Sequence, residues 1–284
     1  MRAMRLARAN VNGVPKVLME ADGGAAFATV DGTEFSDLPE LLEAAGGEAF
    51  RIGPGDSVAV EDAQLLPVVG QPRKIICIGR NYGAHAAERG AEVPAHPMLF
   101  PKWATSLTGP YGDVLLPPES SEADWESELA FVFGRRARRV RAEDAGAVVF
   151  GYTAANDVTM RDFQRHTQQF TAGKAWDRST PVGPSLVSAD ECGGVAPDLA
   201  IQGRLNGELV QDARTSDFIF GVPELVAYIT TVMTMEPGDV VLTGTPAGVG
   251  SALDPPRFLS NGDVFEVEIE RVGALRNVFR AESL

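Results

Sequence analysis

The feature that most constrains the fold of this chain is a succession of short apolar runs bounded by glycine, proline and asparagine turns. Residues 74–79 contain the continuous apolar run Ile-Ile-Cys-Ile, which is typical of a buried strand. Residues 236–242 place a Pro-Gly turn before Val-Val-Leu, and residues 260–269 place an Asn-Gly turn before another strand-like run. Such runs outnumber helical patterns and do not alternate with them regularly, which disfavours a doubly wound sheet. We therefore expect a strand-rich fold.

Two units of unequal size are expected along the 284 residues. Residues 1–66 hold brief apolar runs between turns and one expected helix, residues 36–45, which a serine begins and two glycines end. Residues 65–72 contain two prolines and a glycine, which suits a connector. We predict a small N-terminal domain over residues 1–66 and a main domain over residues 67–284.

Composition excludes several classes of protein. The net charge is −14, from 39 acidic and 25 basic residues, so the chain repels phosphate backbones and is not expected to bind nucleic acid. Cys77 and Cys192 are too few for a disulfide framework or a cysteine-based zinc site. No secretory signal is recognisable, and the most apolar window, residues 218–235, is interrupted by a proline and a glutamate. We expect a cytoplasmic protein without a membrane partner, and interpret the basic run 135–141 as a solvated turn.

Three carboxylates form the first candidate site. Glu126 and Glu128 lie two residues apart in a strand-like stretch, so they point the same way and repel unless a cation or donor lies between them. Asp157 ends another strand-like stretch. Oxygen ligands of this kind suit a hard divalent cation such as Mg²⁺. The simpler interpretation is an exposed strand face with two glutamates and an aspartate that caps a helix.

Further polar patterns surround these carboxylates in the sequence. Arg161 and Gln164 follow Asp157 by four and seven residues, which on a helix would place all three on one face and suit a site for a metal and an anionic ligand. His85 and Glu88 are neighbours on another expected helix, where a carboxylate can orient a histidine as a general base. The simpler interpretation of both patterns is exposed surface polarity.

A glycine-rich turn, residues 242–250, follows an expected strand. It lacks the ending of a Walker A loop, yet its backbone N–H groups and the hydroxyl of Thr245 could hold a carboxylate. The simpler interpretation is a tight hairpin corner. No Gly-x-Gly-x-x-Gly motif is present, so no nucleotide cofactor is expected.

Taken in order, these segments resemble the fumarylacetoacetate hydrolase family from Lys74 to the C-terminus. The motifs that carry the resemblance are Ile78-Gly79-Arg80-Asn81-Tyr82, Asp124-Trp125-Glu126-Ser127-Glu128, Asn156-Asp157, Gly173-Lys174-Ala175-Trp176-Asp177, Leu205-Asn206-Gly207 and Thr243-Gly244-Thr245-Pro246. The resemblance implies an α+β fold, a mixed and curved β-roll with flanking helices. Residues 165–170 look like those of fumarylpyruvate and acylpyruvate hydrolases, which act in aromatic catabolism.

The resemblance also implies a role for each candidate residue. One Mg²⁺ or Mn²⁺ per chain is expected, and the histidine and glutamate pair would lie on a mobile lid. The implied metal ligands are Glu126, Glu128 and Asp157, the implied catalytic residues are His85, Glu88 and Lys174, and the implied substrate-binding residues are Arg161, Gln164 and Thr245.

The expected function is metal-dependent hydrolysis of a C–C bond in an acylpyruvate such as fumarylpyruvate, to pyruvate and a carboxylic acid. The cation would act as a Lewis acid at the 2-oxo acid end. His85, oriented by Glu88, would deprotonate the attacking water, and Lys174 would stabilise oxyanion charge.

Two alternatives to hydrolysis stay open. One is decarboxylation or isomerisation of a 2-oxo-ene-dioate at the same metal site, and the other is a non-catalytic scaffold with a structural cation. A homodimer is expected from the resemblance and from the apolar residues 218–220 and 225–229, although these residues could instead belong to the core.

Overall fold

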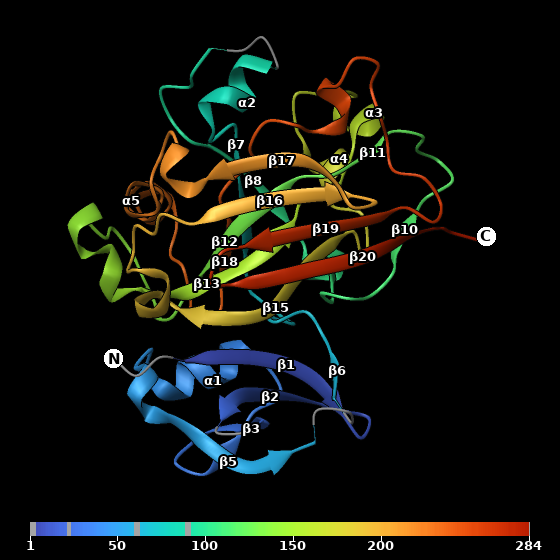
Figure 1. Cartoon of the computed structure of the whole chain (residues 1–284). Helices are drawn as coiled ribbons and strands as arrows, with labels where there is room; N and C mark the ends of the chain where they lie inside the picture. The colour runs from blue at the N-terminus through green and yellow to red at the C-terminus, as the bar shows by residue number, and fades with distance from the viewer. Residues whose placement is uncertain (1–3, 22–23, 60–62, 89–91, 284) are drawn as a thin grey trace.

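The computed structural model describes residues 4–21, 24–59, 63–88 and 92–283, and strands dominate them (Figure 1). Within the described residues, a 13-stranded sheet contains β1 (Arg5–Val11), β2 (Val14–Ala21), β3 (Gly24–Val30), β4 (Thr33–Glu34), β5 (Ile52–Val58), β6 (Ala63–Leu65), β7 (Ile75–Gly79), β8 (Met98–Lys102), β9 (Leu107–Thr108), β12 (Ser127–Phe133), β13 (Val149–Asn156), β15 (Thr180–Ser188) and β18 (Val240–Leu242). A five-stranded sheet contains β10 (Val114–Leu116), β16 (Ala200–Leu205), β17 (Glu208–Arg214), β19 (Val264–Ile269) and β20 (Gly273–Ala281). A short ribbon pairs β11 (Ala123–Asp124) with β14 (Thr159–Met160).

Helices are short and lie around the sheets (Figure 1). The α-helices are α1 (Leu38–Ala45), α2 (Gly83–Glu88), α3 (Arg161–Gln164), α4 (Thr171–Lys174) and α5 (Val222–Val232). The 3₁₀ helices are η1 (Ala49–Arg51), η3 (Ala104–Ser106), η4 (Ala142–Ala147), η5 (Ala189–Cys192), η6 (Thr215–Asp217) and η7 (Gly250–Ala252). The expected mixed, strand-rich fold with flanking helices is confirmed.

The large sheet runs in the order β4-β3-β2-β1-β15-β13-β12-β18-β7-β8. Strand β1 pairs with β15 through Arg5 opposite Val187 and Leu6 opposite Leu186, so the first strands join the rest of the sheet. Figure 1 shows β1, β2, β3, β5 and α1 grouped beside β15. The division at residue 66 stays a prediction.

Strand β12 is buried on both faces, which positions the candidate site inside the molecule. Leu129 and Phe131 belong to one core cluster, shared with β16, β19 and β20, whereas Ala130 and Val132 belong to a second cluster shared with α1. The interpretation of Glu126 and Glu128 as an exposed strand face is therefore wrong, because no face of this strand meets solvent.

The segment after Asp157 differs from the expected helix. Residues Thr159 and Met160 are extended because they pair with Asp124 and Ala123 of β11, and only the single turn α3 follows them. A helical face shared by Asp157, Arg161 and Gln164 therefore does not exist.

The apolar stretch between residues 218 and 235 contributes to the core. Its helix α5 buries Leu225, Val226 and Ile229 completely. Residues 218–220, 227 and 228 are half-buried, and the homodimer stays a prediction from the family resemblance and from these residues. No helix among the described residues is long and apolar enough to cross a membrane.

Candidate active site

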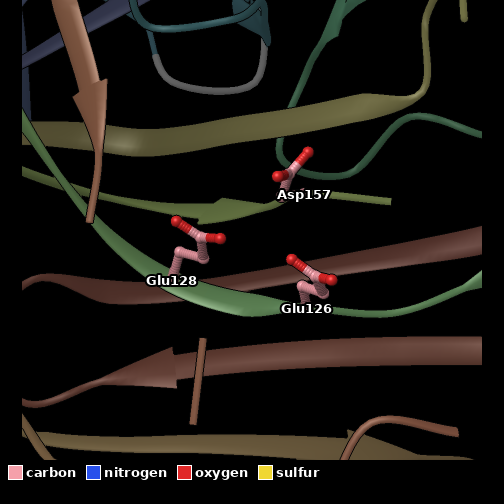
Figure 2. A group of neighbouring side chains, drawn as sticks. All are labelled: Glu126, Glu128 and Asp157. Carbon is pink, nitrogen blue, oxygen red and sulfur yellow. The ribbon is translucent and has the colours of Figure 1, made fainter. Parts of the chain in front are cut away.

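Pairing of β12 with β13 brings the three predicted metal ligands together. Glu128 lies opposite Ala155 in the ladder. The Asp157 N–H donates to the carbonyl of Glu126 at 2.9 Å, and the Glu126 N–H donates to Asn156 Oδ1 at 3.0 Å. Ligand atoms from Glu126, Glu128 and Asp157 all lie within 4.8 Å of one another, and all three side chains are buried (Figure 2).

The carboxylates of this triad have different proton affinities. Burial raises the pKa of Glu128 well above its ordinary value, and the charges of Asp157 and Glu126 raise it further. Burial also acts to raise the pKa of Glu126, but Lys174 and Arg161 outweigh it and lower that pKa to about 2. Buried carboxylates that repel one another gain most from a cation. The triad therefore fits a divalent metal with oxygen ligands.

Two buried lysines approach the triad. Lys174 Nζ donates to Glu126 Oε2 and to Asp157 Oδ2, each at 2.7 Å, so it lies beside the carboxylates as expected. Lys102 Nζ donates to the other oxygen of Asp157 at 2.5 Å. Sequence reasoning missed Lys102, although it is a charged residue at the end of a strand-like run, residues 98–102.

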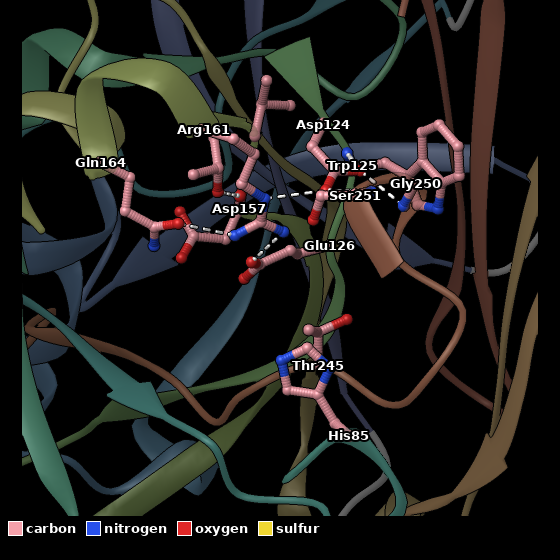
Figure 3. A network of polar contacts seen from close by, with 12 residues as sticks. His85, Asp124, Trp125, Glu126, Asp157, Arg161, Gln164, Thr245, Gly250 and Ser251 are labelled. Carbon is pink, nitrogen blue, oxygen red and sulfur yellow. Dashed lines mark hydrogen bonds and ion pairs between the residues drawn. The ribbon is translucent and has the colours of Figure 1, made fainter. Parts of the chain in front are cut away.

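Arg161 connects the triad to a second buried carboxylate, Asp124 (Figure 3). Its Nε donates to Asp124 Oδ2 at 2.7 Å, its Nη2 forms an ion pair with Glu126 Oε1 at 2.7 Å, and its Nη1 donates to Gln164 Oε1 at 3.1 Å. The Gly250 N–H donates to Asp124 at 2.7 Å. The sequence motif contained Asp124, but its role in orienting Arg161 was missed.

The histidine pair is buried at His85 and exposed at Glu88. His85 in α2 is buried, and its Nδ1 lies 2.6 Å from Glu88 Oε1. The Gly248 N–H donates to Glu88 Oε2 at 3.0 Å, so the glycine-rich turn holds the glutamate in place. In the tautomer in which the Nδ1–H group of His85 donates to Glu88 Oε1, the Nε2 atom is the basic nitrogen. The mobility of this pair as a lid stays a prediction.

The glycine-rich turn after β18 holds a carboxylate, but one that belongs to the protein. The Gly244 N–H donates to Glu128 Oε2 at 2.7 Å. Gly244 has a φ of +97°, and a Cβ there would lie 2.8 Å from the Cβ of Asn81, so only glycine fits. Thr245 Oγ1 accepts from Gln211 Nε2 at 2.8 Å, and Gln211 Oε1 accepts from the Ser127 N–H. Sequence reasoning missed Gln211.

A cavity of about 260 Å³ collects the polar groups of this region. In the view of Figure 3, His85 and Thr245 lie on one side of Glu126, and Arg161 and Gln164 lie on the other. The predicted residues that line the cavity are His85, Glu126, Arg161, Gln164, Lys174 and Thr245. Glu128, Asp157 and Glu88 are not among the lining residues; the first two lie within 4.8 Å of Glu126, and Glu88 contacts His85.

A strand-rich fold with a buried carboxylate triad that could hold a metal ion, and with Glu126, Lys174 and His85 lining one small cavity, has the features of an enzyme active site. The family described as fumarylacetoacetate (FAA) hydrolase C-terminal matches residues 74–280. The chain belongs to this fumarylacetoacetate hydrolase family.

Relatives of known name differ in the reaction they catalyse. The oxaloacetate tautomerase FAHD2B, mitochondrial, of Bos taurus is 43% identical over 218 residues, which are 76% of this chain and 69% of that protein. A fumarylacetoacetate hydrolase from psychrophilic Exiguobacterium antarcticum is 32% identical with a TM-score of 0.83, over 98% of this chain and 100% of that chain. A 5-carboxymethyl-2-hydroxymuconate delta-isomerase from Mycobacterium smegmatis is 31% identical with a TM-score of 0.78, over 99% and 100%. The cytoplasmic location of this chain stays a prediction.

Proposed function

We propose that this protein is a divalent-metal-dependent enzyme that interconverts the enol and keto forms of a small 2-oxo diacid. The single observation that carries the proposal is that Glu126 of the buried carboxylate triad and His85 of the histidine–glutamate pair line one small cavity. The oxaloacetate tautomerase and the delta-isomerase among the relatives support this reaction over the hydrolysis expected from the sequence.

The triad would hold Mg²⁺ or Mn²⁺ through Glu126, Glu128 and Asp157. A bound cation of this kind supplies Lewis-acid chemistry, because it polarises a 2-oxo group and stabilises negative charge on its oxygen. Glu126 is kept charged by Lys174 and Arg161, so one ligand is ionised at neutral pH.

The protein's own residues would move the proton. In the keto-to-enol direction, His85 Nε2, with Nδ1 held by Glu88, would take a proton from the carbon beside the 2-oxo group while the 2-oxo oxygen gains a proton from solvent. In the enol-to-keto direction, that oxygen would lose its proton to solvent and the protonated His85 would give one to the carbon. Lys174 stabilises negative charge on the substrate oxygens as it develops. Tautomerisation consumes no water, so the reaction needs no residue that activates a water molecule.

The size of the cavity favours a short substrate. Pockets for drug-sized ligands measure about 300–1,000 Å³, and this cavity measures about 260 Å³. A dicarboxylic acid of a few carbon atoms suits that volume better than a substrate with a long acyl group.

Hydrolysis of an acylpyruvate is the second candidate. The 2.6 Å contact between His85 and Glu88 favours it, because a histidine oriented in this way can also deprotonate water. The relative named as a fumarylacetoacetate hydrolase supports this reaction within the same fold.

Product analysis separates these reactions. The protein with Mg²⁺ is offered the enol of oxaloacetate and, separately, fumarylpyruvate, and enol absorbance, pyruvate and CO₂ are followed. We expect the enol to be converted to keto oxaloacetate faster than in buffer, with neither pyruvate nor CO₂ formed at that rate. Pyruvate formed together with CO₂ would establish decarboxylation, and pyruvate with fumarate from fumarylpyruvate alone would establish hydrolysis.

A further inference from the structure

Arg80 occupies an unusual backbone position at the edge of the cavity. It follows the buried strand β7 and has a φ of +55°, in the left-handed region that costs energy for residues other than glycine. The next residue, Asn81, is completely buried and fixes the backbone there. Asn81 Nδ2 donates to the carbonyls of Phe220 and Thr243 at 3.0 and 2.8 Å, and its Oδ1 accepts from the Phe220 N–H at 2.8 Å.

The side chain of Arg80 is exposed and lines the same cavity as His85 and Thr245. The other cations of the cavity are engaged: Arg161 with Asp124 and Glu126, Lys174 with Glu126 and Asp157, and Arg165 with Glu122. Within the part of the chain that the structure describes, no carboxylate pairs with Arg80. Among the described residues, the guanidinium of Arg80 is therefore the cation of this cavity that no carboxylate neutralises. Its charge is available to pair with an anionic ligand.

A 2-oxo diacid has two anionic ends. Its 2-oxo acid end would bind the cation that the carboxylate triad is proposed to hold. The distal carboxylate is then left without a partner of opposite charge. A guanidinium binds a carboxylate through two parallel hydrogen bonds, with more geometric specificity than an ammonium group.

We propose that Arg80 binds the distal carboxylate of the substrate and makes the site selective for 2-oxo diacids over substrates without that charge. This inference rests on the proposed function and specifies its substrate class. A site built to pair a substrate charge discriminates strongly, because the analogue that lacks the charge leaves the arginine unpaired.

The test compares oxaloacetate with its 4-methyl ester, which keeps the 2-oxo acid end and removes the distal charge. Wild type, Arg80→Gln and Arg139→Gln are assayed with Mg²⁺ for conversion of the enol of each compound. Arg139 is the matched control, because it is an exposed arginine with a φ of +56° that lies outside the cavity lining.

We expect Arg80→Gln to raise the KM for oxaloacetate by about 10- to 100-fold, the usual effect of losing a charge-assisted hydrogen bond. Its kcat and its KM for the ester should stay close to wild type, Arg80→Lys should restore part of the loss, and Arg139→Gln should change neither KM. An unchanged KM for oxaloacetate, or an equal loss with both compounds, would overturn the inference.

Binding measurements keep this test separate from the proposed function. If wild type converts neither compound, the proposed function fails, and calorimetric titration of each compound with Mg²⁺ present then decides the role of Arg80. The inference is supported if wild type binds the diacid more tightly than the ester and Arg80→Gln binds both equally. A preference that persists in the variant, or its absence in wild type, contradicts it.

Discussion

Glu128 occupies a buried strand with a backbone N–H on one oxygen and two further carboxylates nearby. Its raised pKa means that folding favours the protonated form, so the ionised side chain costs stability when pH rises above its unfolded pKa. Glu128→Gln keeps the shape and the acceptor oxygen but removes this cost. We expect the metal-free variant to gain about 1 kcal/mol, or about 2 °C in Tm, and to lose the rise in Tm that Mg²⁺ gives wild type.

Thermal unfolding with and without Mg²⁺ measures both effects. Glu119→Gln is the control, because Glu119 is exposed and lies outside the triad. A rise in Tm on adding Mg²⁺ that is equal in Glu128→Gln and wild type would exclude Glu128 as a metal ligand.

A second prediction at the residue scale concerns His85 as the proposed general base. Its Nδ1 is fixed by Glu88, and loss of a general base lowers kcat by about 10²- to 10⁴-fold. We expect His85→Ala to show this loss with little change in KM, since the triad and Thr245 would still hold the 2-oxo acid end. Steady-state kinetics on the enol of oxaloacetate measures both constants, and a kcat within threefold of wild type would rule out His85 as the base.

The sequence alone predicted Glu128, His85 and the other candidate site residues because each belongs to a local motif. Lys102, Asp124 and Gln211 were not assigned a role, since their partners come from distant segments. Lys102 reaches Asp157, 55 residues away, only because β8 pairs with β7 beside the core of the large sheet. Spacing along the chain carries no signal for such a contact.

At the scale of elements, the sequence patterns predicted the strands and also the helices at residues 36–45 and around His85, which are α1 and α2. The run at β7 and the turn before β18 were correctly assigned, because strand burial and turn residues are local properties. The helix expected to begin near Asp157 failed because pairing with β11 keeps Thr159 and Met160 extended.

One arginine of the basic run 135–141 binds the C-terminal end of helix α5. Arg138 Nη1 donates to the carbonyls of Thr230 and Thr231, in the last turn of α5, at 2.7 and 2.8 Å. Cations are favoured at this end of a helix, and these carbonyls have no partner within the helix. We expect Arg138→Ala to lower the free energy of unfolding by about 1 kcal/mol, measured by urea denaturation.

Arg136→Ala is the matched control for this prediction. Arg136 pairs with Glu236 but its side chain is 71% exposed, so the loss should stay below about 0.5 kcal/mol. Equal losses in the two variants would show that Arg138 does not act through the helix carbonyls.

At the scale of the whole molecule, a homodimer stays a prediction from the family resemblance. Several large apolar side chains are exposed in the single chain, among them Phe50, Trp103 and Tyr111, at 72%, 49% and 57%. We expect the mass of a dimer in light scattering at micromolar concentration, and a monomeric mass would refute the prediction.

A catalytic role of the metal can be distinguished from a structural role by measurements on the whole molecule. Lys102, Lys174 and Arg161 pair with Glu126 and Asp157 and so offset part of the negative charge of the triad. Chelation should therefore abolish turnover and lower Tm only slightly, by the free energy of binding at the working metal concentration. A large fall in Tm, in a protein that converts no substrate, would indicate the structural cation of a scaffold.

The most direct measurement is the rate of enol-oxaloacetate conversion by metal-stripped protein as Mg²⁺ or Mn²⁺ is added back. For wild type, the rate should rise from that of buffer to saturation as the triad of Glu126, Glu128 and Asp157 fills, and for Glu128→Gln it should stay flat. Full activity in the metal-stripped protein, or equal activation of the variant, would contradict the assignment of this triad as the metal centre of the enzyme.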